Sequence, residues 1–564
     1  MMTHLKRPGA APRISTLLLA ALAAVGGSSR AADPVRVEAG KVAEVSFASR
    51  KPRTDPFNEV TVDAVFTAPD GATLRVPAFW AGGETWKVRY SSRTPGSHRF
   101  RTESSDAADP ALHGVEGVVE VVPYAGDNPL LIHGPLRVAD DRRHFAYADG
   151  TPFFWLGDTW WMGLTDRLSF PDDVRKLADD RVAKGVNVVQ IVAGLYPDMP
   201  AFDPRGRNEA GFPWEPEYAR INPAYFDAAD RRIAYLADRG IVPCIVGAWG
   251  YHLPWLGDAK MKQHWRNLVA RWGAYPVVWC AAGETTMPFY LSKTKAEDAE
   301  RQKKGWTEVM ADLRAIDPFH RLITCHPSRT ARESVTDPAV LDFDMQQTGH
   351  GTPPEGHAAL GALGWDMKPT MPAISGESRY EALEINPTLT DADARKAFWS
   401  HVVASGCAGH TYGANGIWQV NGRGKPYGNS PGGNNWGTTP WDVAMALPGS
   451  SQLAAARKLI ESIPGWDHFE PRPGLVAWAD PAEKAPAPLC VAAPSGSRLI
   501  YILKSGPVRL SGLPAGAAFD LRWFDPISGA VTPPASLPAT ADGSATATPP
   551  EGDHDWALVA TPKG

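Results

Sequence analysis

The period of the hydrophobic positions divides the chain into three stretches. Between residues 35 and 122, apolar and polar residues alternate in short runs that are separated by turn sequences such as Pro69-Asp70-Gly71. Alternation with a period of two is typical of half-buried strands, and strands at this spacing predict an immunoglobulin-like β-sandwich. The stretch after residue 466 returns to short strands and Pro/Gly turns, which predicts a second small β-sandwich.

Residues 130–464 instead alternate wholly apolar runs with segments of helical period. The apolar runs predict eight strands, at residues 153–158, 186–191, 241–249, 276–284, 321–326, 341–347, 372–377 and 407–412. Helices are predicted at residues 171–184, 224–239, 261–272, 296–316, 394–404 and 453–463. Strands that are apolar on both faces and alternate with helices predict an α/β fold, a parallel (β/α)8 TIM barrel. A doubly wound open sheet is the alternative, but Gly157-Asp158-Thr159 after the first strand is no glycine-rich phosphate loop.

These patterns predict four parts: a signal peptide (1–31), an immunoglobulin-like sandwich (32–125), the barrel (126–465) and a C-terminal β-sandwich (466–564). The first part has Lys6, Arg7 and Arg13 before an apolar stretch at residues 14–25, and small residues near position 31. This order is typical of a secretory signal, so we expect an exported protein, periplasmic or secreted. No later stretch is long and apolar enough to predict a membrane span.

Composition excludes several classes of function. The formal net charge of −5 and the pI of about 6.3 give no electrostatic reason to expect a nucleic acid partner. The five cysteines form no CxxC pair, which predicts buried free thiols. The histidines are widely spaced and no HExxH occurs, so neither a metal nor another cofactor is expected. The GxSxG motif of serine hydrolases is also missing from the sequence.

Two glutamates each end an apolar strand and follow a glycine. Glu284 closes the fourth predicted strand and Glu377 the seventh. The carboxyl ends of all strands of a (β/α)8 barrel open onto one face, which carries the chemistry. Two carboxylates that converge there suggest glycoside hydrolysis, with one as general acid/base and the other as nucleophile. The alternative for each glutamate is an ion pair with a neighbouring arginine.

Other strand ends supply candidate substrate-binding groups. A pocket with neutral hydrogen-bonding groups and aromatic faces suits sugars, whereas anionic substrates would need more Arg and Lys. Each candidate also has a purely structural alternative, such as a turn cap or a satisfied core histidine. The candidates are Asp158, Gln190, Trp249, His252, Gln347, His350, His410 and Tyr412. The aromatic, Pro-rich insertion at residues 196–222 is predicted either to form a cleft wall or to be a plain surface loop.

Several motifs resemble those of the apiosidase-like glycoside hydrolases. They are the first-strand sequence FFWLGDTWW (153–161), GESRYE (376–381), GHTYG (409–413) with Ile417-Trp418, and, in the N-terminal domain, FWAGGETWKVR (79–89). The C-terminal stretch resembles the small β-domain of that family that is sometimes labelled collagen-binding-like. The resemblance covers nearly the whole chain after the signal.

The resemblance implies a retaining barrel with Glu284 as acid/base and Glu377 as nucleophile. The characterised type of member releases apiose from branched plant pectin. Two positions depart from the family pattern. At the end of the fourth strand this chain has Ala282-Gly283-Glu284, where the family usually has Gly-Gly-Asp. After Glu377 it has Ser378-Arg379, where the family usually has Pro-Cys. A cation at Arg379 would lower the pKa of the neighbouring carboxylate.

The sequence therefore predicts an exported retaining glycoside hydrolase that cleaves a plant or microbial polysaccharide, an apiosidase-like or other exo-acting pentosidase. Its partner is the oligosaccharide or polysaccharide substrate. A non-catalytic carbohydrate-binding protein on a barrel scaffold is the alternative from another class. A polysaccharide lyase is a weaker alternative, because no uronate-neutralising cluster stands out. The two flanking β-domains are expected to brace the barrel rather than to bind glycan.

Overall fold

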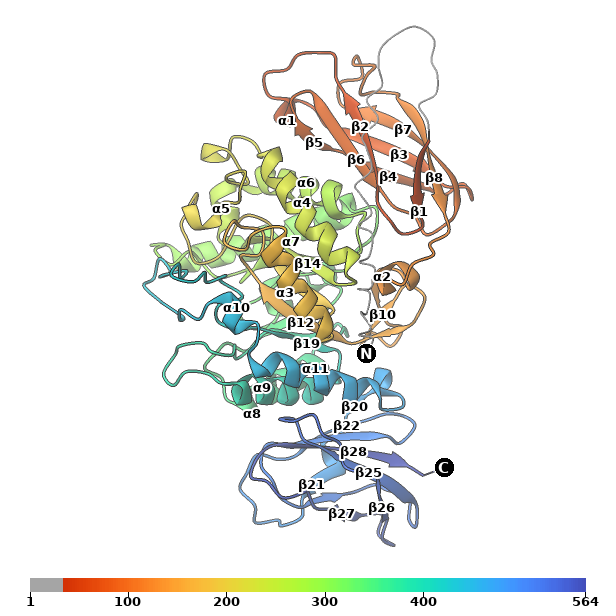
Figure 1. Ribbon diagram of the computed structural model, residues 1–564, viewed down its shortest axis with the longest axis vertical. Helices are drawn as coiled ribbons and strands as arrows, with labels where there is room; N and C mark the ends of the chain where they lie inside the picture. Colours follow the sequence, from red (N-terminus) through yellow and green to blue (C-terminus); the bar gives the residue numbers. More distant parts are fainter. Residues whose placement is uncertain (1–33, 564) are drawn as a thin grey trace, which may run out of the picture.

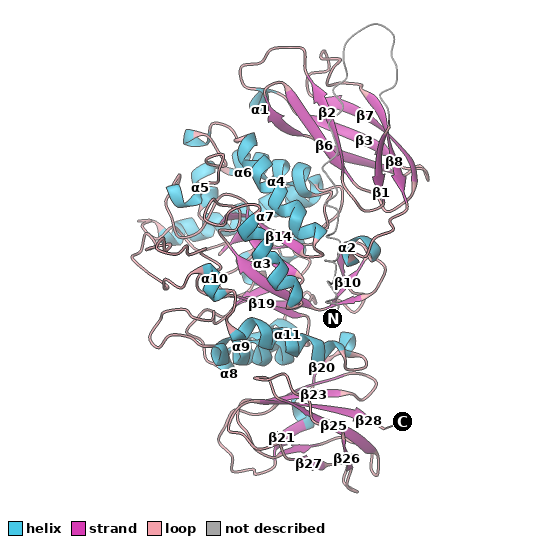
Figure 2. Ribbon diagram, in the orientation of Figure 1, coloured by secondary structure: helices cyan, strands magenta, loops and turns pink. Residues whose placement is uncertain are grey.

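A computed structural model describes residues 34–563, and the predicted signal peptide lies outside the described residues. Figure 1 shows the N-terminal sheets at one end of the molecule, the barrel in the middle and the C-terminal sheets at the other end. Figure 2 shows helices gathered around the central strands, while the two end regions consist almost wholly of strands. Among the helices of residues 34–563, none combines the length and the apolar character that a membrane span requires.

The central sheet confirms the predicted barrel of eight parallel strands. In chain order its strands are β12 (Trp155–Trp160), β13 (Val188–Val192), β14 (Val242–Trp249), β15 (Val278–Gly283), β16 (Ile323–Thr324), β17 (Asp344–Gln347), β18 (Ala373–Glu377) and β19 (Gly409–Tyr412). They pair in the order β16-β15-β14-β13-β12-β19-β18-β17. Across the remaining seam, the Asp342 N–H donates to the Ile323 carbonyl at 2.8 Å and the Thr324 hydroxyl donates to the Phe343 carbonyl at 2.9 Å. The sheet is therefore a nearly closed barrel.

Helices cover the outside of the barrel at the predicted places. They are α3 (Asp172–Ala183), α4 (Pro223–Asp238), α6 (Asp258–Trp272), α7 (Lys295–Ile316), α9 (Asp391–Ser405) and α11 (Pro448–Glu461). The structure adds α5 (His252–Leu256), α8 (Pro354–Asp366) and α10 (Trp441–Ala444), which the hydrophobic pattern does not predict. The five cysteines are all buried and free, as expected.

The N-terminal region is a sandwich of two mainly antiparallel sheets, with the short helix α1 (Pro56–Glu59) in the connection between residues 48 and 62. One sheet has the order β1-β8-β7-β3-β4 and the other β2-β6-β5. The strands are β1 (Val35–Glu38), β2 (Ala43–Ala48), β3 (Val62–Thr67), β4 (Thr73–Pro77), β5 (Phe79–Gly82), β6 (Thr85–Tyr90), β7 (Gly96–Ser104) and β8 (Glu116–Val122). Alternate residues of both sheets, such as Phe66 and Trp86, form one apolar core between them.

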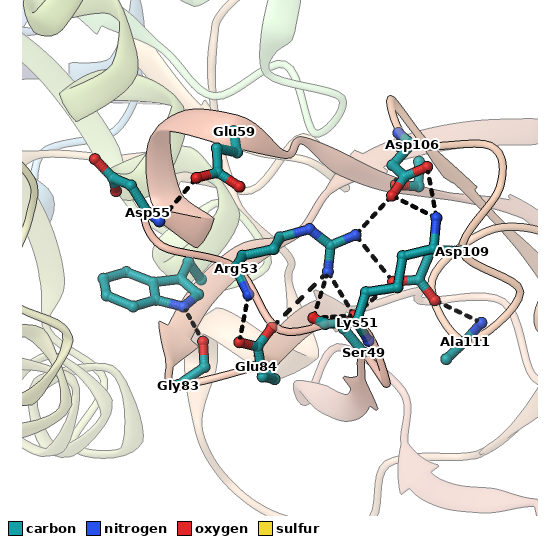
Figure 3. A network of polar contacts seen from close by, with 12 residues as sticks. Ser49, Lys51, Arg53, Asp55, Glu59, Gly83, Glu84, Asp106, Asp109 and Ala111 are labelled. Carbon is teal, nitrogen blue, oxygen red and sulfur yellow. Dashed lines mark hydrogen bonds and ion pairs between the residues drawn. The ribbon is translucent and has the colours of Figure 1, made fainter.

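A charged network fastens the loop between β2 and β3 to the rest of this sandwich. The nearly buried guanidinium of Arg53 lies 2.8 Å from Asp106 and 3.0 Å from Asp109, as Figure 3 shows. Ser49 donates to Asp109 at 2.5 Å, and the backbone N–H of Arg53 donates to Glu84 at 3.1 Å. Because the cation has several carboxylate partners, the loop that leads into α1 is held in one place.

The N-terminal sandwich packs against helices of the barrel. Arg89 on β6 lies 2.7 Å from Asp230 on α4, which also binds Arg271 on α6 at 2.8 Å. Phe57 on α1 packs edge-on against Trp214 of the insertion, with ring centroids 5.8 Å apart. A short segment with α2 (Pro129–Ile132), β9 (Leu136–Val138), β10 (Phe145–Tyr147) and β11 (Pro152–Phe153) then leads into the barrel.

The C-terminal region is the predicted second β-rich domain. Its sheets have the orders β20-β22-β23-β28-β25-β26 and β21-β24-β27. The strands are β20 (Glu470–Pro471), β21 (Val476–Trp478), β22 (Leu489–Ala492), β23 (Arg498–Ile502), β24 (Val508–Leu510), β25 (Ala518–Phe524), β26 (Ala535–Pro538), β27 (Ala545–Ala547) and β28 (Trp556–Pro562). The larger sheet packs on α9, where Trp399 stacks on Tyr501 with centroids 5.5 Å apart. The residue numbers of the domain boundaries stay predictions.

Candidate active site

Glu284 and Glu377 face each other across one pocket at the carboxyl ends of the barrel strands. The side-chain amide of Gln347, which ends β17, donates to Glu284 Oε1 at 3.1 Å and to Glu377 Oε1 at 3.2 Å. One nitrogen therefore bridges both carboxylates. The pocket is also lined by Trp161, Pro197, Asp198, Trp249, Met287, Tyr290, His350, Tyr380, Trp418 and Trp436.

The backbone at Glu284 is strained. Its φ is +37°, a left-handed conformation that non-glycine residues adopt rarely and at a cost of about 1–3 kcal/mol. Gly283 precedes it because the ring of Trp249 lies directly on that residue, where a Cβ atom would come within 2.1 Å. The indole N–H of Trp249 donates to Glu284 Oε2 at 3.3 Å. This packing aims the Glu284 carboxyl at the pocket.

Two histidines surround Glu377. Nε2 of His326 lies 3.3 Å from Glu377 Oε2, and Nε2 of His350 lies 3.3 Å from Oε1. The Nδ1 atom of His326 faces the backbone N–H of Glu284 at 3.5 Å, so it accepts and Nε2 carries the proton. Nδ1 of His350 faces the Ser378 carbonyl at 2.7 Å, so both nitrogens of that ring face acceptors. The geometry thus favours a protonated, cationic His350.

The surroundings shift the pKa values of the two glutamates in opposite directions. For Glu284, burial and then the negative charge of Glu377 raise the pKa above its usual value. Burial also acts to raise the pKa of Glu377, but hydrogen bonds from His326 and His350 outweigh it and hold that pKa well below its usual range. Burial acts to lower the pKa of His350, but the hydrogen bond and charge of Glu377 raise it by more. The site can therefore hold one protonated and one ionised carboxyl.

Aromatic rings form much of the pocket wall. Trp161 follows β12, Trp249 ends β14, and Trp418 and Trp436 both lie in the long connection after β19. The rings of Trp161 and Trp249 meet edge to face at 5.5 Å, and those of Trp418 and Trp436 do so at 5.5 Å. The cavity has a volume of about 160 Å³. It can hold one small ring with hydrogen bonds around it.

Five of the ten predicted site residues line this pocket: Glu284, Glu377, Trp249, Gln347 and His350. Three others are elsewhere. The buried Asp158 points away from the barrel interior to α3, where Arg181 binds its carboxyl at 2.5 Å. Gln190 donates to the Gly376 carbonyl at 2.9 Å and supports β18 from inside the barrel. His252 lies under the insertion, where its Nε2 bonds to the Tyr196 carbonyl at 3.0 Å.

The two candidates of the last strand also face away from the pocket. His410 is buried against Phe398 on α9, and burial lowers its pKa well below the usual value. Tyr412 donates to the Glu381 carboxyl at 2.5 Å, and both side chains are buried. These two side chains lie outside the pocket because strand residues alternate between the barrel interior and the helix layer, and the exact start of each strand decides which face a residue takes.

Arg379 does not act on Glu377 as predicted. Its guanidinium forms an ion pair with Asp393 at 3.0 Å, at the start of α9. The low pKa of Glu377 comes instead from the two histidines. His326 was missed as a site residue, although it lies two positions after β16 and could have been found by extending the strand-end search to that strand.

The insertion at residues 196–222 contributes to the pocket in part. Pro197 and Asp198 line it, whereas Trp214 and Tyr218 face a separate small cavity under the insertion. Asp198 and Tyr290, a residue of the loop after β15, were not candidates, because neither ends a strand. The hydroxyl of Tyr290 donates to Asp198 Oδ1.

Comparison with known proteins agrees with this geometry. The model of the apiosidase-like catalytic domain matches residues 139–467, which is more than half of the chain and contains the whole barrel. The chain belongs to the apiosidase-like family. A second model, a domain of unknown function called DUF5060, matches residues 36–105 in the N-terminal sandwich. No curated protein is similar enough to this chain to count as a match.

Solved structures share the fold of this apiosidase-like protein. A family 5 glycoside hydrolase from Bacteroides vulgatus has 22% sequence identity and a TM-score of 0.64, over 77% of this chain and 94% of that one. A candidate glycoside hydrolase from the same organism has 18% identity and a TM-score of 0.66, over 94% of this chain and 100% of that one. With the family match, these neighbours make the apiosidase-like protein a glycoside hydrolase, whose substrates are carbohydrates.

Proposed function

We propose that this apiosidase-like protein hydrolyses glycosidic bonds with retention of configuration, with Glu284 as acid/base and Glu377 as nucleophile. The single observation that carries the proposal is the opposite pKa shift of two carboxyls that share one amide donor. A general acid needs a raised pKa so that it keeps its proton, and a nucleophile must be ionised.

The spacing of the pair supports retention over inversion. Both Oε1 atoms lie within 3.2 Å of Gln347 Nε2, so the two oxygens cannot be more than about twice that distance apart. Retaining enzymes hold their carboxyl groups about 5–5.5 Å apart, whereas inverting enzymes need about 6.5–9.5 Å to admit a water molecule. The Gln347 bridge therefore fits direct attack by Glu377 on the anomeric carbon.

The reaction then follows in two displacements. First, Glu377 attacks the anomeric carbon, the bond from that carbon to the glycosidic oxygen breaks, and Glu284 gives its proton to the leaving oxygen. The product is a glycosyl ester on Glu377. Second, Glu284 takes a proton from a water molecule while the water oxygen attacks the same carbon and the ester bond breaks. Glu284 is again protonated and Glu377 ionised at the end.

The proposed substrate is a plant or microbial polysaccharide attacked from a chain end. The cavity of about 160 Å³ and the tryptophan rings in its wall suit one terminal sugar ring, which fits an exo-acting apiosidase-like enzyme or another pentosidase. The longer reach of Glu284, compared with the Asp usual in the family, favours a glycone other than apiose. We also propose export, supported by the basic and apolar order of residues 1–31.

A screen of the purified protein tests the proposal. Wild type, Glu377→Ala and the surface control Glu333→Ala are assayed on aryl glycosides and pectic oligosaccharides, with product configuration followed by NMR. We expect turnover with retention in wild type and control, and none in Glu377→Ala. Inverted product, or an active Glu377→Ala variant, would overturn the assignment. Binding of oligosaccharide without any cleavage would instead support the carbohydrate-binding alternative.

A further inference from the structure

A third carboxyl group, Asp198, lines the pocket of the two glutamates. It lies in the insertion after β13 with φ at +59°, a left-handed conformation that is uncommon outside glycine. Its side chain is almost fully buried, at 6% relative exposure. The strained backbone and the burial of the carboxyl group both cost free energy. Another interaction must therefore account for this carboxyl at the wall of the cavity.

In the described residues, only one carboxyl oxygen of Asp198 has a hydrogen-bond partner. The hydroxyl of Tyr290 donates to Oδ1, and within residues 34–563 no group donates to Oδ2. Burial, with a contribution from the charges of Glu284 and Glu377, raises the pKa of Asp198 to about 7. Oδ2 thus remains an unused hydrogen-bonding atom at the pocket.

No cation of the described residues neutralises this carboxyl. The nearest guanidinium, that of Arg205, reaches the backbone carbonyl of Asp198 at 3.4 Å, while it pairs with the Asp203 carboxylate at 2.8 Å and lies over the ring of Tyr427. A structural ion pair therefore does not account for Asp198, in contrast to Asp158 with its Arg181. The remaining explanation for Asp198 is that it binds a ligand.

The charges of the whole lining indicate which ligand. Asp198, Glu284 and Glu377 all face the cavity, and His350 is the one basic side chain in its described lining. His350 is already engaged by Glu377 and the Ser378 carbonyl. A uronic acid would bring a fourth carboxyl group, ionised at neutral pH, into this low-dielectric pocket without an arginine or lysine to bind it. A neutral sugar would bring hydroxyl donors.

We propose that Asp198 is a specificity-determining residue that accepts a hydrogen bond from a hydroxyl of the glycone through Oδ2 and excludes uronic acids from the pocket. Tyr290 acts as its positioning residue, because the phenol holds the carboxyl in one orientation. The inference rests on the proposed glycosidase function for its kinetic test, but not for its binding test.

The kinetic test compares neutral and uronide aryl glycosides of the same ring configuration: xyloside and glucoside with glucuronide, and arabinopyranoside and galactoside with galacturonide. For the neutral glycoside that wild type cleaves, Asp198→Asn should lower kcat/KM about 10- to 100-fold, the range expected for one hydrogen bond to a charged group. Wild type should not cleave the uronides. In Asp198→Asn the ratio of uronide to neutral activity should rise. Glu217→Gln, which removes an exposed carboxylate from the same insertion, is the control and should behave as wild type.

The binding test separates this inference from the proposed function. Free neutral monosaccharides and their uronic acids are titrated into Glu377→Gln protein while tryptophan fluorescence is followed, since four tryptophans line the pocket. Tighter binding of the neutral sugar, weakened in the Asp198→Asn, Glu377→Gln double variant, supports the role of Asp198 even if no glycoside is cleaved. Equal binding of both sugar classes, or an Asp198→Asn change without effect on binding and kcat/KM, would overturn it. Tyr290→Phe should produce a smaller loss in the same direction.

Discussion

Hydrogen bonding at single residues decides the electrostatics of the pocket. Glu377 is buried, and burial alone would favour its neutral form. His326 and His350 reverse this, since each presents a nitrogen 3.3 Å from a different carboxylate oxygen. Among the described residues, Glu284 receives side-chain hydrogen bonds only from Gln347 and Trp249, and it lies close to the Glu377 charge. One environment thus favours a protonated Glu284 and an ionised Glu377, the states that the proposed roles of acid and nucleophile require.

The pH dependence of kcat/KM should reflect this separation. Glu284 must be protonated, so activity should fall as pH rises through its pKa, which lies above the ordinary value of 4.5. Glu377 must be ionised, so activity should fall at the acid end only well below pH 4.5. In His350→Gln the cation is lost and the acid limb should move to higher pH by about 1 unit or more. An acid limb that does not move in this variant would contradict the role given to His350.

Gln347 is the residue through which the two carboxyls are connected. Gln347→Leu removes both hydrogen bonds while it keeps the volume similar, and we expect kcat/KM to fall about 10- to 100-fold. Thermal unfolding of the same protein should show a folded variant, because the side chain faces the pocket rather than the core. Unchanged kinetics would show that the bridge is not needed for the reaction.

Pairing between elements accounts for the predicted site residues that lie away from the pocket. Asp158 on β12 binds Arg181 on α3 at 2.5 Å, and both side chains are fully buried. The Asp158 carboxylate also accepts the indole N–H of Trp160 at 2.9 Å. The pair attaches the first helix to the first strand of the barrel.

Asp158→Ala should therefore destabilise the fold without touching the chemistry. Removal of Asp158 leaves the buried arginine with Asp180, at 2.5 Å, as its remaining carboxylate partner, and we expect a cost of up to about 3–5 kcal/mol. We expect a clearly lower Tm, measured by differential scanning calorimetry, with kcat of the remaining folded enzyme close to wild type. Arg239→Ala, which breaks a half-exposed ion pair with Asp179, is the matched control and should change Tm little. A large drop in kcat for Asp158→Ala would show instead that Asp158 contributes to the active site.

Helix α8 shows why the hydrophobic pattern can fail to predict an element. Its sequence begins with Pro354 and contains three glycines, which disfavour a helix by intrinsic propensity. In the fold it packs closely on α9, where a Cβ atom at Gly361 would come within 2.7 Å of the His401 carbonyl. The glycine allows the close approach of two helices, so tertiary packing outweighs local propensity.

At the scale of the whole molecule, buried polar contacts join the flanking domains to the barrel. Arg395 on α9 binds Asp555 of the C-terminal domain at 2.9 Å, and Tyr501 donates to the same carboxylate at 3.0 Å. Asp555 is fully buried. These contacts and the stack of Trp399 on Tyr501 support the expectation that this domain braces the barrel.

Asp555→Ala should loosen this domain from the barrel. The buried guanidinium of Arg395 would lose its main partner, so we expect a lower Tm and earlier proteolysis in the linker near residue 466. Calorimetry and limited trypsin digestion measure the two effects. The exposed control Asp553→Ala should leave both unchanged. A variant that melts and digests like wild type would show that the two parts are held by apolar packing alone.

The sequence alone was sufficient for the eight barrel strands, six of the helices around them, the two β-rich ends and the family, because these depend on periodicity and short motifs along the chain. It also identified Glu284 and Glu377, since a carboxylate at the end of an apolar strand is a local signal. Which strand-end residues turn inward was decided only by the tertiary structure, through the register of each strand, as Asp158 and His410 show. The same holds for His326 and Asp198, because hydrogen bonds and burial arise between segments far apart in the chain. The opposite pKa values of the two glutamates are a property of that assembled pocket.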